Sequence, residues 1–411
     1  MIEAVNHALP HRKRRWLSKV LLILVVVAYV ACAWLKPLPA ITHSIRPLDP
    51  VPAGTVSLPW PAYGEAAFGA VGYGVLATHG AQTPLPTASI AKVMTALCVL
   101  KAMPLEAGQQ GPNITITQAD VDSYNKYLAE DGSVAPVNVG EHLSEYQALQ
   151  ALLLPSANNI AETLARWAFG SIDAYTTYAN NYATSLGLDS VKITDPSGFL
   201  PSTVASANDL TILGITALKN PVIADIASQP SATLPVAGVV QNVNFLLGSS
   251  GTIGIKTGNN DQDLGAYLFA AKQTVGTQTI TVVGAIMDGP NLPTVLRASL
   301  PLINSTVSNF VSLEAVDAHH QVGTYHVPWQ GDVAVQTKSS LGLTLWKGER
   351  LDKQIILTDS VADGRTDSHA GSRAGLVAVK TLPRDTLQTV PVELRTNIEQ
   401  PSLWWRLTHV F

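Results

Sequence analysis

The sequence predicts an α+β domain with an antiparallel sheet and a helical region, followed by a small all-β domain. Helical periodicity dominates residues 89–186, and three strand-like runs follow at 251–258, 265–271 and 279–287. Beyond Val316, short runs of alternating apolar and polar residues are typical of an all-β domain. The length of 411 residues also exceeds one typical domain, so we expect two folded domains plus peripheral segments.

The N-terminal part has the pattern of a membrane segment. A basic run, HRKRR at 11–15, precedes sixteen residues without a charge at 20–35. A helix of that length spans about 24 Å, slightly less than the hydrocarbon core of a bilayer. Basic residues before such a segment place the N-terminus in the cytoplasm and the rest of the chain outside. We expect residues 1–36 to form a cytoplasmic stub and an anchor or signal segment. The long apolar run favours an uncleaved anchor over cleavage after ACA at 31–33.

The segments that follow can be assigned in order. Residues 37–61 contain seven prolines, which predicts an extended linker. We assign residues 62–315 to the first folded domain, with a first strand at 66–76 and a late helix at 291–314. The β-rich domain should then cover residues 316–400.

The last eleven residues, 401–411, form an amphipathic tail. Leu403, Trp404, Leu407 and Phe411 fall on one helical face. Such a face suits a helix lying in the membrane interface, and it equally suits aromatic side chains that pack on the β-rich domain. Both interpretations stay open at this point.

Composition excludes several classes of protein. With 26 basic and 30 acidic residues and no long run of either sign, nucleic acid is not an expected partner. The two cysteines, Cys32 and Cys98, lie in the membrane segment and in an apolar helix, so no disulfide is expected. The histidines near the domain boundary, at 319, 320 and 326, have no acidic or cysteine neighbours of metal-site spacing, and we expect no metal site. Neither a phosphate-binding loop nor a Gly-x-Ser-x-Gly elbow occurs.

One lysine stands in an unusual setting. In PTASIAKVMTALCVLKAM, residues 86–103, apolar side chains surround the helix on every side, and Lys92 follows Ser89 by three residues. The spacing puts amine and hydroxyl on one helix face. Burial disfavours the charged amine, and a neutral amine beside a serine is a general base. A second Ser-x-x-Lys, SYNK at Ser123 and Lys126, has polar neighbours, and there we expect only a solvated lysine.

Two further motifs lie downstream of this pair. LLLPSANNIAETLA places Ser156 and Asn158 at a joint between two helices, where side chains project into a cleft. GIKTG places Lys256, Thr257 and Gly258 on the first strand of the three-strand meander. Each motif is unspecific alone; SANDL at 206–210, for instance, is expected to be an ordinary helix cap.

Together the motifs resemble those of the penicillin-binding protein and serine β-lactamase superfamily. The order Ser-x-x-Lys, Ser-x-Asn, Lys-Thr-Gly occurs with 67 residues from Ser89 to Ser156 and 100 from Ser156 to Lys256. With TASIAKVMTA, VAPVNVGEHL and VKITDPSGF also in order, the chain is most similar to the low-molecular-mass D-alanyl-D-alanine carboxypeptidases over residues 63–312. The resemblance implies a DD-peptidase/β-lactamase-like catalytic domain, a C-terminal β domain and a membrane-binding tail.

The resemblance also implies catalytic roles. Ser89 would attack the carbonyl between two terminal D-alanines of a peptidoglycan stem peptide, and Lys92 would take its proton. Ser156 and Asn158 would relay a proton to the departing amine and hold the substrate amide.

The third motif implies substrate binding. Lys256 and Thr257 would bind the terminal carboxylate, with Gly258 and Asn259 next to them on the strand. Backbone N–H groups of Ser89 and Asn259 would form the oxyanion hole. Strict alternation points Lys256 and Thr257 to opposite faces, so we expect an edge or strongly twisted strand.

The expected activity is therefore a serine-type D-Ala-D-Ala carboxypeptidase of the cell membrane, facing outward and working without a cofactor. No Glu-x-x-x-Asn motif lies between the second and third motifs, where the sequence reads DPSGFLP. Without that base for deacylation, β-lactams should acylate Ser89 and inhibit the enzyme. A DD-endopeptidase, transpeptidase or β-lactamase reaction at the same site, and a non-catalytic peptidoglycan or β-lactam sensor, remain as alternatives.

Overall fold

The structure is a computed structural model that describes residues 11–259, 264–358, 361 and 368–409. The chain divides into two compact units. One contains Thr55–Ser312 and Thr344–Lys347, and the other contains the residues up to Gly54, Leu313–Leu343 and those from Gly348 onward. Phe411, which completes the predicted apolar face of the tail, lies outside the described residues.

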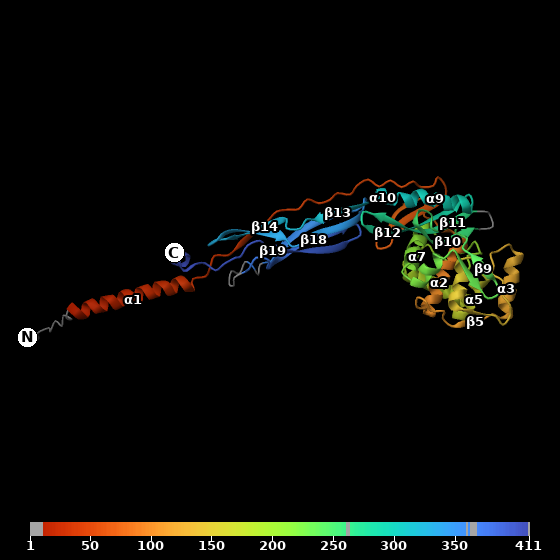
Figure 1. The fold of residues 1–411 in the computed structure, drawn as a ribbon, viewed down its shortest axis with the longest axis horizontal. Coiled ribbons are helices and arrows are strands. Elements are labelled where there is room, and N and C mark those ends of the chain that lie inside the picture. The colour runs from red at the N-terminus through yellow and green to blue at the C-terminus, as the bar shows by residue number, and fades with distance from the viewer. Residues whose placement is uncertain (1–10, 260–263, 359–360, 362–367, 410–411) are drawn as a thin grey trace, which may run out of the picture. The chain divides into compact units, whose positions relative to one another are not determined.

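A five-stranded antiparallel sheet forms the centre of the first unit, in the order β10-β11-β12-β2-β3 (Figure 1). Its strands are β2 (Glu65–Ala70), β3 (Gly74–His79), β10 (Thr252–Asn259), β11 (Gly265–Val275) and β12 (Gln278–Gly289). The predicted meander is therefore confirmed. The single strand expected at 66–76 is wrong, because the chain reverses there into a hairpin, with Gly72 and Gly74 at φ of +84° and +75°.

Both faces of this sheet are covered, and alternate residues of one strand serve the two faces. Tyr267 and Phe269 of β11 pack with the apolar face of α9 (Leu292–Asn304), whereas Leu268 belongs to the core on the other side. Helices α9 and α10 (Thr306–Asn309) lie on one face of the sheet, and α7 (Ala207–Ala217) and α2 (Ala91–Ala102) lie on the other (Figure 1). The period-two pattern thus produces two separate apolar cores.

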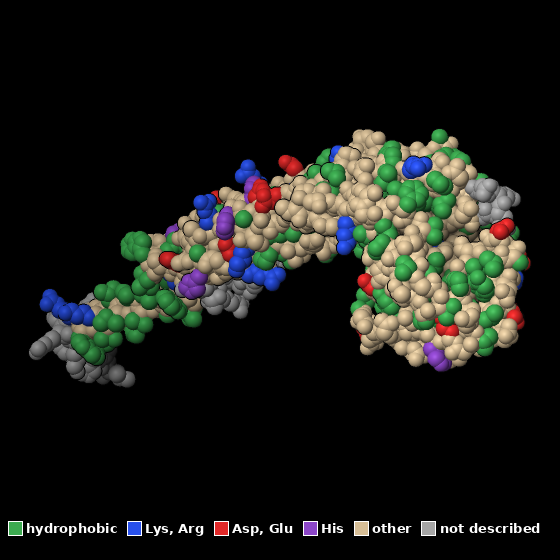
Figure 2. Space-filling view, turned by 45° about the vertical axis from the view of Figure 1, so that its right-hand side comes forward, with side chains coloured by type: hydrophobic (Ala, Val, Ile, Leu, Met, Phe, Trp, Pro, Cys, Tyr) green, Lys and Arg blue, Asp and Glu red, His purple; other side chains and the backbone are tan. Residues whose placement is uncertain are grey.

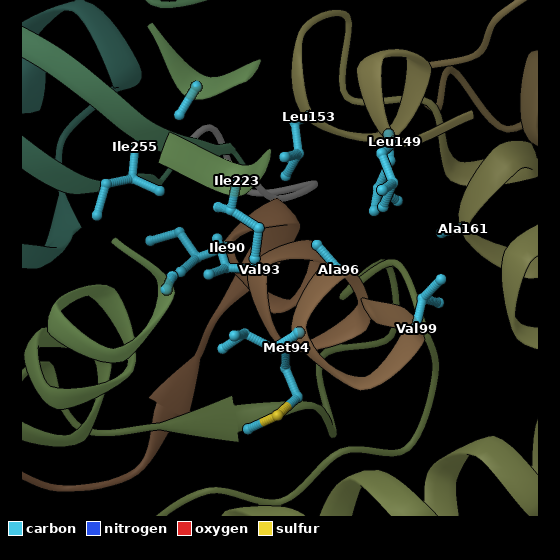
Figure 3. Close-up of a cluster of buried hydrophobic side chains, with 14 of the residues drawn as sticks. Ile90, Val93, Met94, Ala96, Val99, Leu149, Leu153, Ala161, Ile223 and Ile255 are labelled. Atoms are coloured by element: carbon cyan, nitrogen blue, oxygen red, sulfur yellow. The ribbon is translucent and has the colours of Figure 1, made fainter. Parts of the chain in front are cut away.

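The core on the second face is built around α2 (Ala91–Ala102). Side chains from α4 (Glu145–Leu153), α5 (Asn158–Phe169), α8 (Pro221–Ala227) and β10 converge on it (Figure 3). All residues of α2 from Ala91 to Leu100 are buried, as its uniformly apolar sequence predicts. Neighbouring elements therefore pack against α2 on every side.

The remaining helices and hairpins of this unit surround that core. Ser206 caps α7 by accepting a hydrogen bond from the backbone N–H of Asp209, which confirms the expected cap. The other helices are α3 (Gln118–Ala129) and α6 (Ile172–Ser185). The short paired strands are β4 (Leu85–Pro86) with β7 (Val204–Ala205), β5 (Asn113–Thr115) with β6 (His142–Ser144), and β8 (Ser231–Leu234) with β9 (Gly238–Gln241).

The helix predicted at 291–314 is too long. Helix α9 ends at Asn304, the short α10 covers Thr306–Asn309, and strand β13 (Phe310–Val316) follows. Phe310 packs edge-on against the Tyr73 ring, with ring centroids 5.1 Å apart. Strand β13 also pairs with β16 (Leu341–Trp346), so contacts with residues distant in sequence override the local helical pattern here.

The second unit contains a six-stranded antiparallel sheet in the order β1-β14-β15-β19-β18-β17, which agrees with the predicted all-β texture. Its strands are β1 (Thr42–Ile45), β14 (Gln321–Val327), β15 (Gly331–Thr337), β17 (Arg350–Leu357), β18 (Arg373–Leu382) and β19 (Thr386–Leu394). Strand β1 comes from the proline-rich segment 37–61 and pairs with β14, so part of that segment is an edge strand of the sheet.

This unit also holds the apolar N-terminal helix α1 (His11–Leu35). Its stretch Arg15–Leu35 has a mean hydropathy of 2.3 and is long enough to cross a membrane. Hydrophobic side chains cover its surface (Figure 2). Length, composition and exposure are all those of an anchor or signal helix.

The tail forms a short helix, α11 (Leu403–Thr408), beside the end of α1. The Tyr29 hydroxyl donates to the carbonyl of Leu407 at 2.5 Å. Trp405 packs edge-on against Trp329 of the β domain, with ring centroids 6.0 Å apart, whereas Trp404 is 75% exposed. Trp405 is not on the predicted apolar face, so neither packing of that face on the β domain nor its insertion into a membrane interface is established, and both stay predictions.

Candidate active site

The Ser-x-x-Lys pair lies at the start of the buried central helix. Ser89 is in a 3₁₀ turn, Ala88–Ile90, which leads directly into α2. The Nζ of Lys92 lies 2.8 Å from Ser89 Oγ, 2.7 Å from Asn158 Oδ1 and 2.9 Å from the carbonyl oxygen of Ser197. Three oxygen atoms therefore hold the amine in one position beside the serine hydroxyl.

The surroundings of Lys92 favour a neutral amine. Its side chain is 0% exposed, and burial lowers its pKa well below the usual lysine value. Repulsion from Lys256 lowers this pKa further, and the carboxylate of Asp195 opposes the effect. A neutral amine within hydrogen-bond distance of Ser89 Oγ can accept the proton of that hydroxyl.

The Ser-x-Asn motif occupies the joint between α4 and α5, as predicted. Ser156 adopts a left-handed φ of +68° between the two helices, and Asn158 is the first residue of α5. The Ser156 hydroxyl is buried and has no hydrogen-bond partner among the described residues. Leaving a buried hydroxyl unpaired costs free energy, so this hydroxyl, two residues before the Asn158 that contacts Lys92, suits a group that bonds to a substrate.

The Lys-Thr-Gly motif lies on β10, which is one of the two edge strands of the five-stranded sheet. Lys256 and Thr257 are 2% and 4% exposed, and Lys256 Nζ lies 3.0 Å from the Thr257 carbonyl and 3.5 Å from its Oγ1. The two polar ends thus lie close together although the residues are neighbours on a strand. Burial lowers the pKa of Lys256 to about 7.

The end of this strand approaches the serine closely. A Cβ added at Gly258 would lie 3.1 Å from the Thr87 carbonyl and 3.2 Å from the Ala88 side chain, so glycine permits the contact. Asn259, the last residue of β10, is exposed. The backbone N–H groups of Ser89 and Asn259 remain the predicted oxyanion donors.

The second Ser-x-x-Lys has another environment. The Ser123 hydroxyl donates to Glu162 at 2.9 Å, and the Lys126 side chain is 54% exposed, with its Nζ 3.9 Å from Glu162. This lysine is solvated, as the sequence predicts, and its Nζ is directed to a carboxylate.

Sequence reasoning missed Asp195 and Ser197, which lie in the segment DPSGFLP. Asp195 accepts hydrogen bonds from the Ser197 hydroxyl at 2.7 Å, the Phe199 N–H at 3.0 Å and the Thr203 hydroxyl at 2.6 Å. These bonds hold the turn whose Ser197 carbonyl accepts from Lys92. Only the Asp-Pro-Ser-Gly turn pattern in the sequence could have drawn attention to this carboxylate.

An Asp195→Asn substitution tests this arrangement. Because the carboxylate raises the pKa of Lys92, we expect the acid limb of the pH profile of kcat/KM to move to lower pH. The lost turn hydrogen bonds should also reduce acylation roughly tenfold, equivalent to about 1.4 kcal/mol. Rates of penicillin acylation measured from pH 4 to 10 check both effects. A lower rate with an unmoved acid limb would mean that Asp195 acts only through the turn.

Comparison with known proteins agrees with this geometry. A family model described as D-alanyl-D-alanine carboxypeptidase, peptidase S11, matches residues 71–290. The D-alanyl-D-alanine carboxypeptidase DacB2 of Mycobacterium tuberculosis is 32% identical over 234 residues, which are 55% of this chain and 73% of that protein. A D-alanyl-D-alanine endopeptidase of Escherichia coli is 30% identical over 172 residues, 39% of this chain and 51% of that protein.

Solved structures show the same fold. The crystal structure of a Streptomyces DD-transpeptidase matches 62% of this chain and 98% of its own, with a TM-score of 0.52 and 25% identity. Penicillin binding protein 5 from Haemophilus influenzae matches 84% of this chain and 100% of its own, with a TM-score of 0.59 and 18% identity. The catalytic-domain fold and its following β domain are therefore those expected from the motifs.

Proposed function

This chain belongs to the peptidase S11 family of D-alanyl-D-alanine carboxypeptidases, and from that premise we propose that it removes the terminal D-alanine from peptidoglycan stem peptides. The reaction proceeds through an acyl-enzyme on Ser89. The observation that carries the proposal is the contact of a fully buried Lys92 amine with Ser89 Oγ at 2.8 Å.

In the first step, Ser89 Oγ bonds to the carbonyl carbon between the two D-alanines, and its proton passes to Lys92 Nζ. The N–H groups of Ser89 and Asn259 stabilise the oxyanion. The carbon–nitrogen bond then breaks, and the leaving amine receives a proton through the Ser156 hydroxyl, which has no other described partner. Terminal D-alanine departs and the penultimate D-alanine remains as an ester on Ser89.

In the second step, water attacks this ester, Lys92 accepts the water proton, and Ser89 Oγ leaves with a proton. Asn158 has two tasks in this scheme. Its Oδ1 holds Lys92 at 2.7 Å, and its Nδ2 remains to donate to the substrate amide.

In this proposal, residues of strand β10 recognise the free C-terminal end of the substrate peptide. A cation and a hydroxyl at Lys256 and Thr257 suit a carboxylate, and the substrate's terminal carboxylate is the group that a carboxypeptidase must recognise. Endopeptidase action is the second candidate, because one relative of 30% identity is a D-alanyl-D-alanine endopeptidase. That reaction would cleave a cross-link rather than a free peptide end.

The setting is a membrane surface. In this proposal α1 anchors the enzyme and the catalytic domain works on the outer side, where peptidoglycan lies. β-Lactams inhibit the enzyme by forming a long-lived ester on Ser89.

One paired assay tests the proposal. The purified protein, residues 1–411 in detergent, is incubated with a pentapeptide ending in D-Ala-D-Ala, with a cross-linked muropeptide dimer and with a chromogenic cephalosporin. We expect release of D-alanine from the pentapeptide and a single stoichiometric turnover of the cephalosporin. Cleavage of the dimer without release of D-alanine would establish the endopeptidase instead, and sustained cephalosporin hydrolysis would establish a β-lactamase.

A further inference from the structure

A cavity of about 290 Å³ lies beside the proposed nucleophile. Ala88, the residue before Ser89, lines it. So does Gly265, which is paired with Asn259 at the end of β10. The cavity therefore lies beyond the Lys-Thr-Gly motif, in the direction in which β10 runs.

This position determines which part of a substrate reaches the cavity. In the proposed function the terminal carboxylate is at Lys256 and Thr257, and the scissile carbonyl is at Ser89. An extended peptide advances about 3.3–3.6 Å per residue, so the residues before the scissile bond continue past Ser89 toward the end of β10. The cavity lies on the side that receives this acyl part of the substrate.

The walls of the cavity are largely apolar, and Leu85, Phe199 and Pro201 contribute side chains to them. Asp288, at the end of β12, is the only ionisable residue among the described residues that line it. Its side chain is exposed. Apolar walls around a single carboxylate suit an aliphatic side chain that carries a positive charge at its tip.

A second acid, Glu65, lies near Asp288 but is not among the described residues that line the cavity. The nearby Glu65 is buried and accepts hydrogen bonds from the N–H groups of Thr83 and Ala207. The pKa of Glu65 is raised, first by burial and to a smaller extent by the charge of Asp288. Because the raised pKa favours the neutral form of Glu65, Asp288 is the residue that supplies negative charge among the described residues lining the cavity.

We propose that the cavity binds the side chain of the stem-peptide residue that precedes the two D-alanines, and that Asp288 accepts a hydrogen bond from a primary ammonium group at the end of that side chain. This inference rests on the proposed function and adds a specificity-determining residue to it. A peptide whose side chain ends in a free amine is then a better substrate than the same peptide with the amine acetylated.

The test uses two synthetic peptides, Nα-acetyl-L-Lys-D-Ala-D-Ala and its Nε-acetylated form. We expect the parent enzyme to release D-alanine from the free-amine peptide with a kcat/KM about fivefold higher, the upper range for a partly exposed ion pair. Raising the salt concentration should reduce this ratio. In an Asp288→Asn variant the ratio should fall close to one. Asn suits the left-handed φ of +58° at this position, so the backbone is preserved.

An Asp173→Asn variant is the matched control, because this exposed acid lies in the first turn of α6, away from the cavity lining. It should keep the ratio of the parent. Equal kcat/KM values for the two peptides in the parent enzyme, or an unchanged ratio in Asp288→Asn, would overturn the inference while leaving the proposed function intact. If neither peptide releases D-alanine, competition of the two peptides against fluorescent penicillin labelling gives the ratio, and equal competition overturns the inference. Absence of penicillin labelling as well would overturn both proposals.

Discussion

A Ser89→Ala enzyme should release D-alanine from a pentapeptide at least about 10⁴-fold more slowly than the parent, since the acyl-enzyme cannot form without the hydroxyl. It should also take up no covalent fluorescent penicillin. The removed oxygen belongs to the half-buried Ser89, in the turn that precedes the buried helix α2, so the fold is expected to be kept. Intact-protein mass spectrometry after penicillin treatment gives the result directly.

The chain offers a matched control for this variant in its second Ser-x-x-Lys. A Ser123→Ala protein loses a hydroxyl with the same spacing to a lysine, and that hydroxyl bonds to Glu162 instead of to an amine. It should be labelled at the rate of the parent. Penicillin labelling of the Ser89→Ala protein would show that the nucleophile is another residue.

Replacing Lys92 by methionine should slow acylation roughly 10³-fold, the middle of the range for loss of a general base. Methionine has a similar length and accepts burial, but it provides no donor for Asn158 Oδ1 and no acceptor for the Ser89 proton. A Lys126→Met variant, changed at a side chain that is 54% exposed, should acylate normally.

The pH profile separates this role from a structural one. In the parent, kcat/KM should rise with pH as Lys92 loses its proton, because only the neutral amine can act as base. It should fall again above about pH 7, where the free enzyme loses the charge on Lys256 that binds the substrate carboxylate. In Lys92→Met the rising limb should be absent. A rising limb that persists at the same pH would assign that proton to a different group.

Much of the site could be predicted because its residues disagree with their local surroundings. A lysine is unusual in a helix that is apolar on every side, and Lys92 is completely buried in the structure. The joint at Ser156 was visible from the proline between two helical patterns, and the strand position of Lys256 from its alternating neighbours. Such signals are local, so one sequence is sufficient to read them.

The parts that sequence reasoning missed depend on contacts that are distant in sequence. Asp195 lies in a sequence typical of an ordinary turn. Only the fold shows that it holds Ser197, whose carbonyl oxygen accepts a hydrogen bond from Lys92. Phe310, inside the helix predicted at 291–314, instead begins β13 and packs against the Tyr73 ring, and β1 pairs with β14, which lies far along the chain. Periodicity carries no information about such partners.

Strand β1 is synthesised long before the strand with which it pairs, β14. Thr42–Ile45 leaves the ribosome soon after the apolar helix, yet its partner residues, Gly323–His326, are made only after the whole catalytic domain. The catalytic domain is thus inserted, in sequence, between two strands that pair with each other. Its ends must be brought together before the β domain can be completed, and closing a chain over a folded domain costs less entropy than closing the same length of disordered chain. Pairing of β1 with β14 is therefore expected to be favoured once the catalytic domain has folded.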